Sequence, residues 1–209
     1  MKKIVVLCTM SLLAFSAAVT ASSTAVPGQG PFGFQWGMTK DQIIELVGQK
    51  SVKEGDSNGI EILNLSTAPK PHPAFESYTL ILSPERGLLK IVAVGKTIQT
   101  NGFGSEVHDA FIEMRDTVSA TYGSAKTFDL LKSGSIWNEP REWMMGLLKK
   151  ERILTAYWNE TAKLPNHITV IELEGEALSR ESGYLSLAYQ FEGFSEYLQS
   201  QKAKAGSVF

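Results

Sequence analysis

The chain has 209 residues, of which 43% are hydrophobic and 20% are charged, and its formal net charge is −2. This composition is that of a globular protein and excludes an intrinsically disordered chain. The slightly acidic balance also argues against nucleic acid as a partner, because nucleic-acid binding needs a basic surface.

The first residues have the pattern of a secretory signal peptide. A basic start precedes an apolar run over residues 4–19, and Val19-Thr20-Ala21 ends in small residues that suit a cleavage site. We therefore expect removal of residues 1–21 by cleavage after Ala21, and a periplasmic location. No later apolar run approaches the roughly 20 residues of a membrane-spanning helix, so no transmembrane segment is expected after cleavage.

The only cysteine of the chain, Cys8, belongs to this expected signal peptide. Disulfides, zinc–thiolate sites and a cysteine nucleophile are therefore not expected in the rest of the chain. Residues 22–35 are rich in Ser, Gly and Pro, which indicates a flexible leader. A single folded domain is expected over residues 36–209.

A short helix is expected over residues 40–47, because separate boundary signals agree. Thr39 begins the pattern of a capping box, and Met38 and Ile43 stand at the positions of a hydrophobic staple. Gly48 follows where a glycine commonly ends a helix.

Strands are expected after this helix. Residues 51–54 and 59–65 have strand-like composition, and apolar alternation predicts a third strand around residues 78–82. The turn residues 83–87 then return the chain into a fourth strand over residues 88–97, as the second arm of a hairpin.

The second half repeats the order of helix and strands. Its first helix is expected to begin with Ser105 as the N-cap and to end at Gly123, since its apolar residues fall on one helical face. Another helix is expected after Asn138. Three strands and a polar terminal helix follow, at Ile153–Asn159, Ile168–Glu174, Tyr184–Phe191 and Ser195–Lys204.

Helices followed by runs of consecutive strands predict an α+β fold, with an antiparallel sheet and helices packed on one side. The order of a helix and then strands occurs twice. The domain is therefore either one unit or a pair of sub-halves over residues 36–100 and 101–209, which share a layout but little residue identity.

The segment from Phe34 to Ile43 resembles a signature of exported bacterial domains, in which Gly37-Met38-Thr39 opens a short helix. BamE/SmpA-like envelope-assembly lipoproteins and β-lactamase-inhibitor-protein-like domains share this signature. The resemblance implies a small α/β layer that binds protein, and it transfers no functional residue. The chain departs from the lipoproteins because no lipid-anchor cysteine follows its signal peptide.

No cofactor and no metal site are expected. Residues 28–33 match the spacing G-x-G-x-x-G, but they contain Pro31 and follow no strand, so a dinucleotide site is not indicated. The histidines His72, His108 and His167 stand in separate elements, each without a second histidine at metal-ligand spacing. The sequence also has no Gly-x-Ser-x-Gly elbow and no Ser-x-x-Lys nucleophile motif in a plausible setting.

Glu172, Glu174 and Glu176 alternate along an expected strand and its exit. One interpretation is a set of paired carboxylates for acid–base catalysis. The other is a solvated strand face, which we favour because carboxylates are plentiful and scattered in this chain.

The densest group of interface-type residues lies between Ile136 and Met145. Trp, Arg and Met are enriched at protein interfaces, and a single helical stripe cannot bury all of them. The group is therefore either core packed under a loop, which is the simpler interpretation, or a binding patch. The candidate patch residues are Trp137, Arg141, Trp143, Met144 and Met145.

These observations predict an exported, non-catalytic protein that binds another protein of the cell envelope or assists it as an accessory factor. A periplasmic inhibitor or immunity protein is one alternative. An enzyme whose acid–base carboxylates lie far apart in the sequence is another, since such pairs leave no local motif.

Overall fold

The computed structural model describes residues 30–57, 60–159 and 164–206. The expected signal peptide and residues 22–29 of the expected leader lie outside these residues. The elements of the first half are η1 (Pro31–Gly33), α1 (Lys40–Val47), η2 (Gln49–Ser51), β1 (Val52–Ser57), β2 (Ile60–Leu65), β3 (Phe75–Ser83), β4 (Gly87–Gly95) and β5 (Ile98–Gln99).

The second half begins with the longest helix of the described chain. Its elements are α2 (Ser105–Tyr122), β6 (Lys126–Leu131), η3 (Pro140–Glu142), α3 (Trp143–Leu148), β7 (Arg152–Trp158), β8 (Ile168–Ala177), β9 (Ser182–Phe191) and α4 (Phe194–Gly206). No helix among the described residues is both long enough and apolar enough to cross a membrane.

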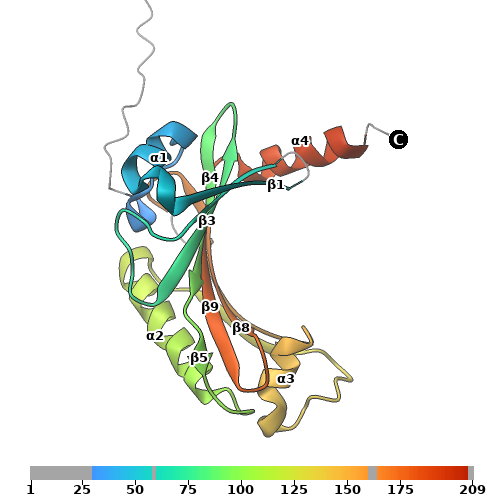
Figure 1. Cartoon of the computed structure of the whole chain (residues 1–209). Coiled ribbons are helices and arrows are strands. Elements are labelled where there is room, and N and C mark those ends of the chain that lie inside the picture. The colour runs from blue at the N-terminus through green and yellow to red at the C-terminus, as the bar shows by residue number, and fades with distance from the viewer. Residues whose placement is uncertain (1–29, 58–59, 160–163, 207–209) are drawn as a thin grey trace, which may run out of the picture.

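The expected α+β fold with an antiparallel sheet is confirmed, although the helices are not all on one side, because α4 packs on the face opposite to α2. In the described part of the chain, nine strands form one antiparallel sheet in the order β1-β2-β3-β4-β9-β8-β7-β6, and β5 pairs with β9. The two sets of strands meet at the central pair of β4 and β9. The sheet is strongly curved, with α1 and α2 on its convex side, α3 towards its far end and α4 across one end of its concave side (Figure 1).

The convex face of the sheet carries the main hydrophobic core. Leu80, Ile91, Tyr189 and Ile171 are successive cross-strand partners from β3 to β8, and all four side chains are buried. They pack in one cluster with the apolar stripe of α2 that the sequence predicts, which consists of Val107, Phe111, Met114 and Val118. Burial of this kind stabilises by roughly 25 cal/mol per Å² of apolar surface, so this layer accounts for most of the stability of the fold.

The boundaries of α1 are those expected. Thr39 Oγ1 accepts a hydrogen bond from the Gln42 backbone at 3.3 Å, and the Gln42 side chain accepts one from the Thr39 backbone at 3.0 Å, which completes the capping box. The N–H of Gly48 donates to the Ile44 carbonyl at 2.8 Å, and its positive φ of 81° suits glycine at a helix end.

The start of α2 differs from the expected cap. Gly104, in the left-handed region with φ of 71°, is the N-cap, and Ser105 is the first helical residue. A Cβ atom at Gly104 would lie 2.2 Å from the Trp143 ring. The close approach of α3 therefore selects glycine here over a side chain that caps the helix.

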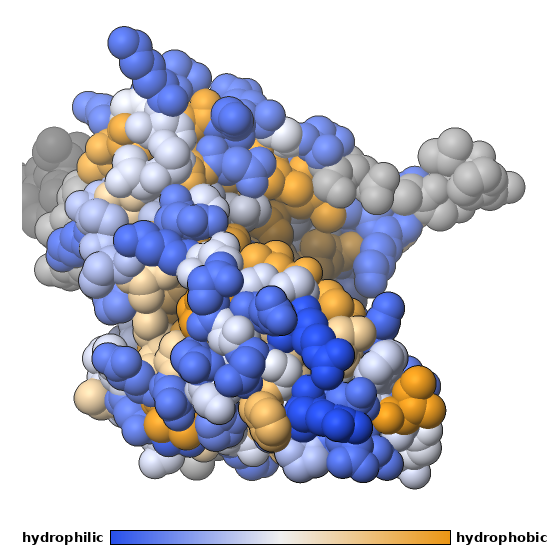
Figure 2. All heavy atoms as spheres, turned by 60° about the horizontal axis from the view of Figure 1, so that its bottom comes forward, coloured by the Kyte–Doolittle hydropathy of each residue, from blue (hydrophilic) through white to orange (hydrophobic). Residues whose placement is uncertain are grey.

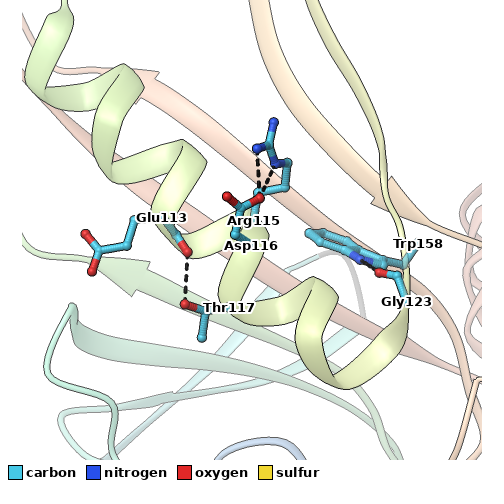
Figure 3. A network of polar contacts seen from close by, with 6 residues as sticks. All are labelled: Glu113, Arg115, Asp116, Thr117, Gly123 and Trp158. Atoms are coloured by element: carbon cyan, nitrogen blue, oxygen red, sulfur yellow. Dashed lines mark hydrogen bonds and ion pairs between the residues drawn. The ribbon is translucent and has the colours of Figure 1, made fainter.

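The end of α2 is held by a tryptophan from the neighbouring sheet. Trp158 Nε1 donates a hydrogen bond of 2.8 Å to the carbonyl of Gly123, the C-cap residue (Figure 3). Gly123 ends the helix as expected, with φ of 88°. This bond satisfies one of the carbonyls that every helix leaves unpaired at its C-terminus and ties α2 to β7.

The folded domain begins before residue 36. Phe34 is fully buried, and the Phe32 ring makes edge contacts with the rings of Phe75, Tyr78 and Tyr189 at 5.5, 5.0 and 5.8 Å. Residues 30–35, which the composition assigned to the flexible leader, are therefore part of the core. The glycines and prolines around these two phenylalanines indicated a loop and masked the apolar anchor that it carries.

The strand β6 was not expected from the sequence. It pairs with β7 without a register shift, from Lys126 opposite Tyr157 to Leu131 opposite Arg152. All its side chains except that of Leu131 are exposed. Phe128 and Leu130 alternate with polar neighbours, but no side chain of β6 is buried, so the pattern marks no core face.

Candidate functional site

The concave face of the sheet is divided into a covered half and an open half. Ile81 points to this face, because its neighbours Leu80 and Leu82 point into the main core. With Leu89, it packs against Phe194 and other apolar residues of α4 in a small second cluster. The helix α4 therefore covers the concave face over β3 and β4.

The concave face over β6 to β9 is the open half. None of the described helices packs on it, since the apolar residues of α2 and α3 belong to the convex core. Figure 2 shows apolar side chains in a recess on the side of the molecule to which the concave face turns in Figure 1. The residues that alternate with core positions here, which we call the open face, are Phe128, Leu130, Ile153, Thr155, Tyr157, Glu172, Glu174, Glu176 and Tyr184.

A row of three half-buried glutamates runs along β8 through the open face. Glu176 forms an ion pair with Lys150 from the turn before β7. Among the described residues, no Lys, Arg or His nitrogen lies within 4.0 Å of the carboxylates of Glu172 or Glu174. The row is therefore only partly neutralised.

The middle carboxylate of the row is the most perturbed. Burial raises the pKa of Glu174 above its usual range, and the negative charges of Glu172 and Glu176 raise this pKa further, while Lys150 and Lys90 oppose the shift. Glu174 is thus held in an environment that disfavours its charge, which a fully solvated strand face would not do.

Two tyrosines flank this row on the neighbouring strands. Tyr157 on β7 stands opposite Glu172, and a hydrogen bond to Glu172, together with burial, raises the pKa of the Tyr157 phenol. Tyr184 on β9 stands opposite Glu176, and burial followed by the charge of Glu176 raises its pKa. Both tyrosines stay neutral at physiological pH and present a phenol beside a carboxylate.

A buried hydroxyl lies in the middle of the open face. Thr155 on β7 stands directly opposite Glu174 and is only 3% exposed. Its Oγ1 is close enough to the Tyr157 phenol to lower the pKa of that group, but it has no hydrogen-bond partner of normal geometry among the described residues. Buried hydroxyls are almost always hydrogen-bonded, so Thr155 Oγ1 is an unusual buried oxygen that remains able to accept a hydrogen bond.

An apolar rim borders the open face at the edge of the sheet. Phe128 and Leu130 on β6 and Ile153 on β7 are large hydrophobic side chains that are exposed, and Leu130 stands opposite Ile153. The Phe128 ring lies 6.4 Å from the Tyr157 ring, which joins the rim to the tyrosines. Grouped exposed apolar residues of this kind mark interaction surfaces.

The predicted patch between residues 137 and 145 is split by the structure. Met144 is fully buried and Trp143 is 9% exposed, so both side chains belong to the core and do not form a surface patch. The indole Nε1 of Trp143 donates to Asp129 at 3.2 Å, and the Arg152 guanidinium lies 5.9 Å above its ring. Close packing of α3 on the convex face accounts for this burial.

The other three patch residues stay accessible. Trp137 and Met145 are half-buried, and Arg141 is exposed. A binding patch at these three residues therefore stays a prediction. The residues of the open face were found in part: alternation revealed Glu172, Glu174 and Glu176, whereas the alternation of Phe128 and Leu130 with polar neighbours was the signal that sequence reasoning missed.

An apolar pocket of about 340 Å³ lies beside α2, on the side of the sheet away from the open face, with Ile98 and Met114 in its lining. Thr117 also lines it, but the Thr117 hydroxyl donates to the Glu113 carbonyl within the helix at 2.9 Å (Figure 3). None of the buried unpaired polar atoms of the described residues lines this pocket. The lining also includes His72, Lys96 and Glu113, so polar groups border this mainly apolar pocket without a buried unpaired atom that points to a ligand.

The histidines serve local contacts in the described structure. His72 Nδ1 accepts a hydrogen bond from the Ala74 backbone at 3.2 Å, and His167 Nδ1 lies 3.0 Å from the carboxylate of Glu192. Across residues 30–57, 60–159 and 164–206, no three His, Cys, Asp or Glu side chains come close enough to hold a metal ion.

Comparison of the chain with family models, with curated proteins and with solved structures finds no match in any of the three. Its function is therefore inferred from the residues of the open face themselves.

Proposed function

We propose that the protein is an exported, non-catalytic protein that binds another protein of the cell envelope through the open face. The observation that carries this proposal is a sheet face that none of the described helices covers. This face nevertheless gathers exposed Phe128, Leu130 and Ile153 beside two tyrosines. An antiparallel sheet can leave one face to water, but that face is then usually polar.

The composition of the open face also favours a protein as the partner. Aromatic side chains are enriched in protein interfaces, and Tyr157 and Phe128 lie next to each other here. Glu172 and Glu174, which have no cation at ion-pair distance within residues 30–57, 60–159 and 164–206, would repel the phosphates of nucleic acid. A curved sheet face also suits a convex protein surface, in contrast to the small enclosed pocket that a metabolite requires.

A catalytic role is the second candidate, and one observation favours it. The raised pKa of Glu174 next to Glu172 is the kind of perturbation that acid–base catalysis uses. These carboxylates lie on an open sheet face, however. They line neither the pocket beside α2 nor a second pocket that is lined by Thr39 and Glu61. Binding therefore accounts for more of the geometry than catalysis does.

The test compares two exposed phenylalanines. Phe128 lies on the open face, and Phe103 lies in the loop before α2. A tagged full chain is expressed in its native cell, and proteins that co-purify are identified by mass spectrometry for the wild type, Phe128→Asp and Phe103→Asp. We expect an envelope protein to co-purify with the wild type and with Phe103→Asp, and to be lost with Phe128→Asp.

The variants must be folded for this comparison, which thermal melts by circular dichroism establish. A partner that stays bound to folded Phe128→Asp would contradict the assignment of the open face. Leu130→Asp, at a second exposed position of the same rim, repeats the test without relying on one substitution.

A further inference from the structure

The chemistry of the open face points to the kind of side chain that it binds. We propose that the open face recognises a lysine or arginine of its protein partner, whose cationic head lies among Glu172, Glu174 and Thr155 while its neighbours pack on the apolar rim. This inference rests on the proposed function, because it names the chemistry of the partner at the same site.

The glutamate row already binds one lysine within the chain. The Lys150 ammonium pairs with Glu176 at one end of the row. Within the described residues, Glu172 and Glu174 have no cation at ion-pair distance. The row therefore has room for one more cation of the same chemistry, next to the one that it holds.

The buried hydroxyl of Thr155 is the second, independent observation. Thr155 is more than nine-tenths buried, stands opposite Glu174 and leaves Oγ1 without a hydrogen-bond partner of normal geometry among the described residues. A hydroxyl oxygen can accept a hydrogen bond from an ammonium or a guanidinium. A cation placed between Glu174 and Glu172 would satisfy this oxygen together with the carboxylates.

An organic cation fits this geometry better than a metal ion does. Alternate residues of a strand lie about 6.6 Å apart, so the glutamates form a row and do not converge on one point. The described residues accordingly contain no group of three potential ligands close enough to bind a metal. A single side-chain cation needs only two carboxylates and one further acceptor.

The flanks of the row suit the rest of such a side chain. Lysine and arginine carry long apolar stems that pack on hydrophobic surface while their heads remain polar. Phe128 and Tyr157 offer that surface next to Thr155, with their rings 6.4 Å apart. Lys90 and Lys150 lower the negative potential at Glu174, which favours a single cationic side chain over a polybasic tail.

The first experiment measures binding of short peptides to the protein purified from expression of the full chain. The probes are acetylated pentapeptides in which leucine alternates with lysine, with glutamine or with glutamate, and spermidine serves as a free organic cation. Calorimetry gives each dissociation constant. We expect the lysine peptide to bind about tenfold or more tightly than the glutamine peptide, because hydrogen bonds to charged groups are the strong ones.

The second experiment locates the site. The double variant Glu172→Gln with Glu174→Gln keeps the shape of both side chains and removes their charge. The matched control is Glu45→Gln with Glu113→Gln, at exposed positions of α1 and α2. We expect the first variant to bind the lysine and glutamine peptides equally and the control to keep the wild-type preference. Thermal melts verify that both variants are folded.

The outcomes separate this inference from the proposed function. If the lysine and glutamine peptides bind equally to the wild type, and Phe128→Asp weakens both, the open face binds protein but the cation inference is wrong. If spermidine binds as tightly as the lysine peptide, the ligand is a free polyamine, and the assignment of the cation to a protein partner is wrong. If Phe128→Asp leaves peptide binding unchanged, the open face is not the site and the proposed function fails as well.

Discussion

The covered and open halves of the concave face are built from the same kind of strand and differ in what lies over them. In the covered half, Leu89 and Ile81 pack with Phe194 and Tyr197 of α4. In the open half, the corresponding layer exposes Phe128 and a row of glutamates. On the convex face both halves are buried in one continuous core.

The difference shows that strand alternation alone does not decide which sheet face becomes core. Period-2 patterning places side chains on two faces, and a third element must cover a face before its apolar residues contribute to stability. α4 supplies this cover for one half only. The apolar residues of the other half are then free to serve binding, at the cost of exposed hydrophobic surface.

The largest effect is expected in the convex core, which both halves share. Trp143→Ala removes a buried ring and its hydrogen bond of 3.2 Å to Asp129. We expect a loss of about 3–5 kcal/mol in the free energy of unfolding, which is the usual cost of a buried tryptophan. Urea denaturation measures it, and a loss below about 1 kcal/mol, the range of surface substitutions, would show that α3 is not part of the core.

The direct comparison of the two concave halves uses one substitution at two phenylalanines. Phe194 is 6% exposed in the first turn of α4, whereas Phe128 is 36% exposed on β6. Phe194→Ala is expected to cost about 2–3 kcal/mol, below a full core loss because α4 can detach locally, and Phe128→Ala about 1 kcal/mol or less.

Hydrogen exchange locates the first of these effects. Phe194→Ala should remove the protection of the amides of α4 and leave those of β8 and β9 unchanged. Equal costs for Phe194→Ala and Phe128→Ala would remove the distinction between a covered and an open half.

A smaller effect is expected at the helix cap of the first half. Thr39→Ala removes the hydroxyl that accepts a hydrogen bond from the Gln42 backbone, whereas the backbone N–H at position 39 can still donate to the Gln42 side chain. We expect a loss of about 1 kcal/mol in the free energy of unfolding, measured by urea denaturation. Binding of the partner should be unchanged, since α1 lies on the convex side, and weaker binding by a fully folded Thr39→Ala would move the site towards α1.

The smallest effect concerns the pH dependence of stability in the open half. The pKa of Glu174 is raised in the folded protein, so its ionised form destabilises the fold at pH values above that pKa. This cost disappears below the pKa of the unfolded chain, where both states bind the proton. Glu174→Gln should therefore raise Tm at pH 7, by an amount that shrinks as the pH falls to about 4.

The control for this prediction is Glu113→Gln, at an exposed position of α2. We expect it to keep the wild-type Tm at both pH values. A Tm of Glu174→Gln equal to that of the wild type at pH 7 would mean that Glu174 is solvated like an ordinary strand carboxylate.

Local sequence signals predicted those elements whose residue pattern matches the burial of the same residues in the structure. The capping box at Thr39 and the apolar stripe of α2 are both found in the structure, because each depends on neighbours within one or two helical turns. The cap of α2 was wrong, since the glycine at position 104 is required by Trp143, which lies far along the chain. Contacts of this range leave no local pattern.

The candidate site was harder to predict for the same reason. The sequence grouped Trp143 and Met144 with accessible Arg141, because composition does not distinguish a helix face in the core from one at the surface. It found the alternation of Glu172 and Glu174 but not the strand that places Phe128 beside them. Sheet order, which brings β6 next to β7, decided that arrangement.

We propose that the open half of the concave face is the surface that binds a partner. The most direct measurement is photo-cross-linking in the native cell, with a benzoylphenylalanine in place of Phe128 in one chain and of Phe103 in another, both exposed in the free protein. We expect a cross-linked species of one defined mass from position 128 and none from position 103. A partner captured from position 103 and not from position 128 would contradict this proposal.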